Sequence, residues 1–337
     1  MHALVCRAPG ELALDERPEP ERADTDVLVQ VRRVGVCGTD FHIFEGSHPY
    51  LEYPRVIGHE LGGEVLEAAS GSAFRPGQTV VVNPYLSCGS CLACRKGKPN
   101  CCMQIKVLGV HRDGGMCERI AVPEANLYAA GNLSVEQAAT TEFLAIGAHA
   151  VARSGLGRGA PALVVGAGPI GLGTALFATM AGGDVTIMDY DRERLAVAVQ
   201  SGIAARAIKA GDGGEDLVAE ATGGDGFDLV FDATGSRASM EESFGHVAHG
   251  GTLVMVGVVS KAITFSDPEF HKREMMVLAS RNALRSDFER VMTALEKGLV
   301  PVDRLLTHRT TLAGAVRDIP QWASDKKGLV KALVEIG

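Results

Sequence analysis

Four cysteines in one short segment constrain the fold of this chain most strongly. Two successive Cys-x-x-Cys steps, followed by a fourth thiol eight residues later, can bring four sulfur atoms around one tetrahedral ion. Zn²⁺ favours such an all-thiolate shell where its role is structural. The loop is rich in Gly, Pro, Lys and Arg, so it should have little structure without a metal, and its cations favour the thiolate form. The expected ligands are Cys88, Cys91, Cys94 and Cys102.

The fourth ligand could instead be Cys101, but adjacent thiols in an extended segment point in different directions, and we choose Cys102. A disulfide framework would require an oxidising compartment. The chain opens Met-His-Ala-Leu-Val-Cys, without the basic region and long apolar run of a signal peptide. A redox Cys-x-x-Cys would be a single pair beside a thioredoxin-like βαβ unit, and none is apparent. We therefore expect reduced, metal-binding cysteines and a cytoplasmic location.

The length and net charge of the chain limit its number of domains and the classes of partner it could bind. The 337 residues suit two domains better than one compact core. The formal charge of −8 argues against nucleic acid or an anionic membrane surface as the main partner. No apolar stretch approaches the roughly 20 residues of a membrane span. The expected partner is therefore a small molecule, without nucleic acid or membrane.

The pattern of apolar residues changes along the chain. The first 140 residues carry short apolar runs broken by turn residues, which predicts a β-barrel-like domain. From about residue 146, strands alternate with helices, which predicts a parallel doubly wound sheet and hence an α/β fold. The expected strands are 27–32, 62–67, 78–83, 162–165, 185–188, 227–232 and 251–257, and a helix is expected over 170–180.

A glycine-rich loop lies between a predicted strand and a predicted helix. In Gly166-Ala-Gly168-Pro-Ile-Gly171, the first glycine permits a tight turn, the second lets a pyrophosphate approach, and the third lets the helix pack on the strand. Asp189 ends the next strand, where its carboxylate can accept hydrogen bonds from ribose hydroxyls and would repel a 2′-phosphate. This favours NAD over NADP. The expected cofactor-binding residues here are Gly166, Gly168, Pro169, Ile170, Gly171, Asp189 and Arg194.

A second constellation is typical of a catalytic metal site. Cys37, His59 and a carboxylate supply the ligand types that Zn²⁺ accepts, and a catalytic zinc usually keeps one position open. The carboxylate is either Glu60, adjacent to His59, or Glu142.

These segments together resemble the zinc-dependent medium-chain alcohol dehydrogenases, and the similarity spans the whole chain. The polyol subgroup, which includes sorbitol and threonine dehydrogenases, is similar in Cys37-Gly-Thr-Asp40, in Gly58-His-Glu60 and in an acidic position that matches Glu142. Phe143 follows Glu142 where the subgroup has proline. The resemblance implies a GroES-like β-barrel catalytic domain (1–145 and 284–337) and a Rossmann NAD-binding domain (146–283). It also implies two zinc ions, one catalytic and one structural; we expect a homo-oligomer, either a dimer or a tetramer.

Within the family, the chain is most similar to bacterial sugar-acid 5-dehydrogenases acting on L-galactonate or L-gulonate. The segments that carry this similarity are 100–102, 107–115, 265–272 and 280–283. It implies NAD-dependent oxidation at C5. A neutral polyol such as sorbitol, or L-threonine, is the alternative substrate. A non-catalytic NAD-binding protein would be expected to lose Cys37, His59 or Thr39, and all three are present.

The resemblance also assigns roles to individual residues. Thr39 matches the hydroxyl of the proton relay, and His42 matches its outer imidazole. Asp40 is expected to orient His59 from outside the metal shell. Arg281 and Asn282 match a loop that contacts the nicotinamide half of the cofactor. The candidates to meet a substrate carboxylate are His111, Arg112, His271 and Lys272.

Overall fold

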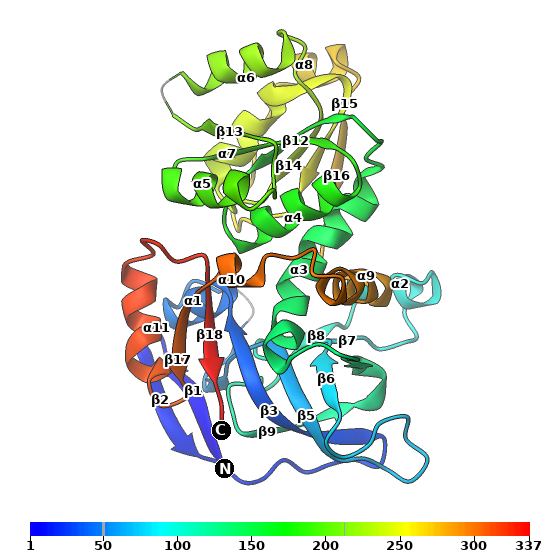
Figure 1. The fold of residues 1–337 in the computed structure, drawn as a ribbon, viewed down its shortest axis with the longest axis vertical. Coiled ribbons are helices and arrows are strands. Elements are labelled where there is room, and N and C mark those ends of the chain that lie inside the picture. The colour runs from blue at the N-terminus through cyan, green and yellow to red at the C-terminus, as the bar shows by residue number, and fades with distance from the viewer. Residues whose placement is uncertain (49–50, 212) are drawn as a thin grey trace. The chain divides into compact units, whose positions relative to one another are not determined.

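The computed structural model describes residues 1–48, 51–211 and 213–337. They form two compact units, labelled by element in Figure 1. The first unit comprises Met1–Glu142 and Val291–Gly337, and the second comprises Phe143–Arg290. The domain limits expected from the sequence, 1–145 with 284–337 and 146–283, stay a prediction about where the functional domains end.

The first unit is built on β-sheets, and its central strand is β3. This strand pairs antiparallel with β5, β9 and β18, so segments from both ends of the chain meet in one sheet. The sheet runs β10-β6-β5-β3-β18-β17, and a second sheet runs β2-β1-β4. The strands are β1 (His2–Ala8), β2 (Glu11–Glu16), β3 (Asp26–Val36), β4 (Arg55–Val56), β5 (Glu60–Glu67), β6 (Thr79–Val82), β7 (Tyr85–Leu86), β8 (Lys106–Val107), β9 (Arg119–Pro123), β10 (Leu127–Ala129), β17 (Leu306–Thr311) and β18 (Lys331–Glu335).

Alternation along β3 explains how this sheet buries one face. Val27, Val29 and Val31 are fully buried and the residues between them are partly exposed, as the period of two in a strand requires. The alternation ends after Val31, and the last three residues of β3, from Val34 to Val36, are all buried. The helices of this unit are α1 (Gly38–Phe44), α2 (Leu92–Arg95), η1 (Pro99–Cys101), η2 (Glu124–Asn126), α10 (Val302–Leu305) and α11 (Ala315–Ser324), while α3 (Val135–Ser154) and α9 (Arg285–Glu296) contain residues of both units.

The second unit is a parallel doubly wound sheet, as predicted. Its strand order is β13-β12-β11-β14-β15-β16, and every neighbouring pair is parallel. The order reverses between β11 and β14, where folds of this type bind ligands beyond the carboxyl ends of the strands. The elements are β11 (Pro161–Val165), α4 (Pro169–Met180), β12 (Asp184–Asp189), α5 (Arg192–Gln200), β13 (Arg206–Lys209), α6 (Gly214–Thr222), β14 (Phe227–Asp232), α7 (Arg237–Glu242), η3 (Ser243–His246), β15 (Val247–Met255), α8 (Asp267–Lys272) and β16 (Met276–Ala279).

Each predicted strand overlaps an observed one, and the limits differ by four residues at the end of β3 and at the start of β15. Strand β15 begins at Val247, four residues before the expected start at Gly251. The pairing of β15 with β14 is irregular there, and Gly250 has a φ of 77°. The sequence Gly250-Gly251 therefore resembles a turn although it lies within a strand.

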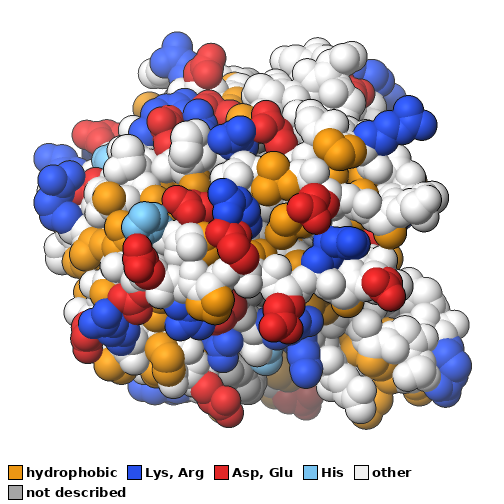
Figure 2. All heavy atoms as spheres, turned by 90° about the horizontal axis from the view of Figure 1, so that it is seen from below, with side chains coloured by type: hydrophobic (Ala, Val, Ile, Leu, Met, Phe, Trp, Pro, Cys, Tyr) orange, Lys and Arg blue, Asp and Glu red, His pale blue; other side chains and the backbone are white. Residues whose placement is uncertain are grey.

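Acidic and basic side chains are interspersed on the face shown in Figure 2. Several of them form exposed ion pairs, such as Arg7 with Asp15 and Arg309 with Glu335. In the part of the chain that the structure describes, no helix is both long and apolar enough to span a membrane.

Candidate active site and metal centres

The four predicted zinc ligands of the cysteine-rich loop lie together. The sulfur atoms of Cys88, Cys91, Cys94 and Cys102 are all within 4.8 Å of one another. Cys91 precedes the short helix α2, and Cys102 follows the 3₁₀ turn η1, so two local turns fold the segment back on itself. The side chain of Cys102 is buried in this group, whereas Cys101 is exposed and outside it.

Backbone groups around these thiols favour the charge that a metal requires. The N–H groups of Ser90 and Cys91 lower the pKa of Cys88 to about 6. The backbone N–H groups of Cys88 and Gln104 donate to the sulfur of Cys102 at 3.2 and 3.4 Å. Desolvation, followed by the neighbouring thiol of Cys91, raises the pKa of Cys94 to about 12. Because neighbouring thiolates repel each other, a divalent cation would let all four ionise together.

A second cluster lies in the first unit, where α1 meets β5. Cys37 is the N-cap residue of α1, Glu60 is the first residue of β5, and His59 directly precedes it. One possible ligand atom of each lies within 4.8 Å of the others. His59 and Glu60 are buried, and the buried Nδ1 of His59 has no hydrogen-bond partner among the described residues. A buried imidazole nitrogen without a partner fits a residue that binds a metal.

Asp40 connects the two segments that carry these residues. It is fully buried, and its two oxygens accept hydrogen bonds from the backbone N–H groups of Cys37 (2.8 Å) and Gly58 (3.1 Å). Asp40 therefore fixes the backbone of Cys37 itself and of the residue before His59. This contact joins Asp40 to the backbone of the segment that carries His59, and it supports a positioning role.

Glu60 forms a buried ion pair with Lys331 that the sequence did not reveal. The Nζ atom of Lys331 lies 2.6 and 2.7 Å from the two carboxylate oxygens and 3.2 Å from the carbonyl oxygen of Val36. Both side chains are almost fully excluded from solvent. Gly35, the cross-strand partner of Glu60, leaves room for this arrangement, because a Cβ at Gly35 would lie 2.0 Å from Oε2 of Glu60.

Glu142 interacts electrostatically with His59 and Glu60, but it is not one of the three residues whose ligand atoms lie within 4.8 Å of one another. It is buried in α3, and the hydroxyl of Tyr85 donates a hydrogen bond to it. Burial, opposed by His59 and assisted by Glu60, raises the pKa of Glu142 to about 7. The pKa of His59 is raised well above its usual value. Burial alone would lower this pKa, but the acidic neighbours, with Cys37 the strongest, outweigh the effect of burial. Lys331 balances one of these buried acidic groups, and a divalent metal would supply further positive charge.

The predicted relay residues lie on α1 beside this cluster. The hydroxyl of Thr39 is 3.7 Å from the sulfur of Cys37. His42, one turn further along α1, is exposed, and its Nδ1 lies 3.3 Å from the hydroxyl of Ser47 and 3.5 Å from a carboxylate oxygen of Glu45. The helix therefore places Thr39 at the cluster and His42 at the surface.

The glycine-rich loop of the second unit has the geometry expected of each glycine. Gly166 has a φ of 98°, and a Cβ at Gly171 would lie 1.7 Å from the carbonyl oxygen of Gly166. Within the described residues, a Cβ at Gly168 would meet no heavy atom within 4 Å. Asp189 accepts hydrogen bonds from the backbone N–H groups of Ala167 (2.5 Å) and Asp191 (2.8 Å). The loop thus offers an open backbone surface at the N-terminus of α4.

The other residues assigned to the cofactor lie at the same edge of the sheet or near it. Arg194 is on α5, 3.7 Å from a carboxylate oxygen of Asp191. Arg281 and Asn282 follow β16, beyond its carboxyl end, and Asn282 adopts a left-handed φ of 52°.

Two of the residues expected to meet a substrate carboxylate, His271 and Lys272, are exposed at the end of α8.

Two family models match the sequence. One, described as the alcohol dehydrogenase GroES-like domain, covers residues 23–132, and the other, described as zinc-binding dehydrogenase, covers residues 169–297. The L-galactonate-5-dehydrogenase of Escherichia coli K12 is 39% identical to this chain in an alignment 341 positions long, which covers 99% of this chain and 98% of that protein. The chain belongs to the zinc-binding alcohol dehydrogenase family. It is therefore an oxidoreductase that acts on CH–OH groups.

Other members of the family resemble the chain over nearly its whole length. The sorbitol dehydrogenase of Halalkalibacterium halodurans is 31% identical and covers 93% of both proteins. A solved structure of RspB from Escherichia coli CFT073, in complex with NADH, is 30% identical, with a TM-score of 0.92 and 99% of each chain covered. These matches confirm the predicted pair of a GroES-like domain and a Rossmann domain.

Among the described residues, Lys331 and Tyr85 lie in this dehydrogenase's site and were missed by sequence reasoning. Lys331 stands alone in the apolar run Leu329-Val-Lys-Ala-Leu-Val334, where a charged residue must find a buried partner. That isolated lysine was the available signal. Tyr85 gave none, because its contact with Glu142 depends on packing between segments 57 residues apart.

Proposed function

We propose that this dehydrogenase uses zinc and NAD to oxidise the C5 hydroxyl of L-gulonate or L-galactonate to a ketone. The close set of Cys37, His59 and Glu60 carries the proposal, because thiolate, imidazole and carboxylate together suit Zn²⁺. The similarity to an L-galactonate-5-dehydrogenase supports the substrate class.

Cys37, His59 and Glu60 would hold the catalytic zinc in this proposal. Glu60 is preferred to Glu142 because one of its carboxylate oxygens lies within 4.8 Å of a ligand atom of Cys37 and of His59. The bonds to Lys331 leave each carboxylate oxygen a further lone pair. Glu142 remains the alternative carboxylate, since its charge acts on His59.

The chain's own residues would carry the proton away from the reaction. Bound zinc would act as a Lewis acid toward the substrate hydroxyl, and bound NAD would accept the hydride from C5. Thr39, beside Cys37, would accept the hydroxyl proton and pass on its own. His42 is exposed and can exchange the proton with solvent. Asp40 would hold α1 and the segment that carries His59 in fixed positions relative to each other during this transfer.

The glycine-rich loop would hold the pyrophosphate of NAD. The open surface at Gly168 and the start of α4 at Pro169 and Ile170 fit the approach of phosphate oxygens. Asp189 would accept hydrogen bonds from the ribose through lone pairs that Ala167 and Asp191 do not use. Arg194, Arg281 and Asn282 stay proposed cofactor contacts.

The cysteine cluster would hold a second, structural zinc. Cys102→Ser should therefore lower the zinc content of the purified chain from two ions to one and reduce its stability, since a closed structural site contributes directly to folding. Cys101→Ser is the matched control, because Cys101 is exposed and outside the cluster. It should retain both ions in elemental analysis. Equal zinc content in the two variants would show that Cys102 is not a ligand.

The substrate class is tested by NAD reduction with matched substrates. L-gulonate and L-galactonate are compared with sorbitol, galactitol and L-threonine, each with NAD and with NADP. Because a hydrogen bond to a charged group contributes about 1.5–3 kcal/mol, the sugar acids should have a kcat/KM roughly 10–100-fold higher than the polyols. The similarity to a sorbitol dehydrogenase makes a neutral polyol the second candidate. Higher activity with sorbitol would select it, and equal use of NADP would contradict the role of Asp189.

A further inference from the structure

Asp232 is a fully buried carboxylate at the carboxyl end of β14, a strand labelled in Figure 1. Among the described residues, hydrogen-bond donors surround its two oxygens, but no lysine, arginine or histidine forms an ion pair with it. Burying a carboxylate without a cation is costly unless hydrogen bonds replace the lost water. The segments that those hydrogen bonds hold in place therefore indicate the role of the residue.

Four donors from three successive segments converge on this carboxylate. Oδ1 accepts hydrogen bonds from the backbone N–H (3.0 Å) and the hydroxyl (2.7 Å) of Thr234. Oδ2 accepts hydrogen bonds from the hydroxyls of Ser239 on α7 (2.7 Å) and Ser243 on η3 (3.0 Å). Hydrogen bonds to a charged acceptor are stronger than those between neutral groups. The carboxylate therefore ties the loop after β14, α7 and η3 to the end of the strand.

The backbone at the same position joins β14 to both of its neighbouring strands. The carbonyl oxygen of Asp232 accepts hydrogen bonds from the N–H groups of Val256 (2.8 Å) and Gly257 (2.9 Å), which follow β15. The N–H group of Ala233 donates to the carbonyl oxygen of Val165, the last residue of β11, at 2.9 Å. The loop after Asp232 therefore begins where three strand ends of the parallel sheet meet.

This loop packs directly against the glycine-rich loop. A Cβ at Gly166 would lie 3.1 Å from the methyl carbon of Thr234 and 3.3 Å from the carbonyl carbon of Ala233. A Cβ at Gly171 would lie 3.6 Å from the Cβ of Ala233. Ala233 and Thr234 therefore form one wall of the glycine-rich loop. Thr234 is exposed, although the carboxylate that holds it is buried.

We propose that Asp232 is a positioning residue for NAD. By holding residues 233–235 against the glycine-rich loop, it keeps that loop in the conformation that receives the pyrophosphate, and such preorganisation increases affinity. This inference rests on the proposed function, which places the pyrophosphate at Gly168. Asp232 acts without touching the cofactor, because its carboxylate is excluded from solvent. Its loss should lower the affinity for the cofactor and leave the chemical step nearly unchanged.

The test is the affinity of the zinc-loaded protein for NADH, measured by calorimetric titration. Asp232→Asn keeps the size of the side chain, but its amide nitrogen cannot accept the hydrogen bonds that one carboxylate oxygen accepts. We expect the dissociation constant for NADH to rise about 10-fold, the size of one hydrogen bond to a charged group. KM for NAD should rise by a similar factor, while kcat at saturating NAD should change little.

A double-mutant cycle with Thr234→Val shows whether the two residues act together. Valine removes the hydroxyl that donates to Oδ1 and keeps a methyl group for the contact with Gly166. Because Thr234 is proposed to act through Asp232, the double variant should lose no more affinity than the more strongly affected single variant. Should Asp232→Asn fail to fold, Thr234→Val should still weaken NADH binding, whereas Thr234→Ser should retain it.

Thr222→Val is the matched control for a lost hydroxyl in the same unit. The Thr222 hydroxyl accepts a hydrogen bond from the backbone N–H of Gly226 at 3.1 Å, just before the other end of β14. This variant should be less stable but should bind NADH as the wild type does. The inference is overturned if Asp232→Asn binds NADH normally, if Thr222→Val weakens binding equally, or if the effects of Asp232→Asn and Thr234→Val multiply.

Gly168→Val tests separately where the pyrophosphate binds. Within the described residues, a Cβ at Gly168 would meet no heavy atom within 4 Å, so the variant should fold normally. It should nevertheless lose NADH affinity, because its side chain would occupy the surface that the pyrophosphate approaches. Normal binding by Gly168→Val would overturn this part of the proposed function, whatever the result for Asp232→Asn.

Discussion

Thr39→Val should reduce kcat by roughly 10²–10⁴-fold, the usual contribution of a positioned general acid or base. Valine keeps the shape of threonine and removes the hydroxyl that lies 3.7 Å from the sulfur of Cys37. The proposed path from the substrate to His42 is then interrupted at its first step. Steady-state kinetics at neutral pH measure the loss.

Thr39→Ser is the matched control, because it keeps the hydroxyl and should retain most of the activity. Zinc content and NADH affinity of the valine variant should equal those of the wild type, which would separate a lost proton path from a damaged metal site. A near-normal kcat in Thr39→Val would show that the proton leaves by another route.

Lys331→Met should lower the free energy of unfolding by about 3–5 kcal/mol, because breaking a buried ion pair leaves an uncompensated charge. Both oxygens of Glu60 lose their partner in a site that excludes water. The measurement is urea unfolding after removal of the metal, so that zinc does not replace the ammonium as the counter-charge.

Lys327→Met is the control for the loss of a lysine near the same strand, and it should be nearly neutral because Lys327 is exposed. The double variant Lys331→Met with Glu60→Gln should recover much of the lost stability, since no unpaired charge is then buried. If the single variant is as stable as Lys327→Met, the ion pair is not a structural requirement of the site.

Features that depend on local spacing could be predicted from the sequence. The four thiols and the glycine-rich loop lie within short segments, where a few turns determine which side chains meet. The parallel sheet followed from the alternation of strands and helices. These patterns are local, so the order of residues is enough to indicate them.

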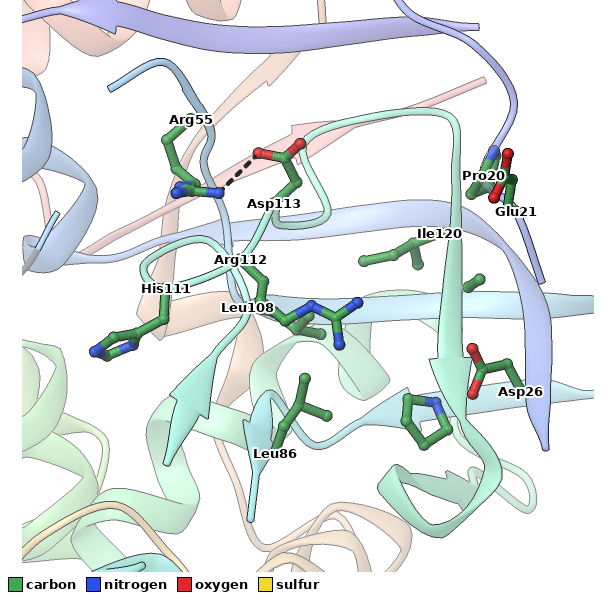
Figure 3. Close-up of a pocket in the computed structure, with 12 residues that line it drawn as sticks. Pro20, Glu21, Asp26, Arg55, Leu86, Leu108, His111, Arg112, Asp113 and Ile120 are labelled. Carbon is green, nitrogen blue, oxygen red and sulfur yellow. Dashed lines mark hydrogen bonds and ion pairs between the residues drawn. The ribbon is translucent and has the colours of Figure 1, made fainter. Parts of the chain in front are cut away.

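The contacts that were missed join distant segments. Lys331 and Glu60 are 271 residues apart and meet only because β18 pairs with β3, which in turn pairs with β5. Asp40 was expected to orient His59, but no pattern in the sequence indicates that its carboxylate accepts hydrogen bonds from the backbone of Cys37 and Gly58. The side chains of His111 and Arg112, which are neighbours in the sequence, point to opposite sides in Figure 3. Their directions depend on the conformation of one turn, which residue order does not specify.

The central claim is that the cluster at Cys37 and His59 is a zinc site for NAD-dependent oxidation. The most direct measurement is NAD reduction with L-gulonate before chelation, after chelation, and after Zn²⁺ is restored to the same sample. We expect activity to be lost when zinc leaves the site at Cys37 and His59 and to return when zinc is restored, because a catalytic site keeps an exchangeable position. Full activity in the zinc-free chain would contradict it.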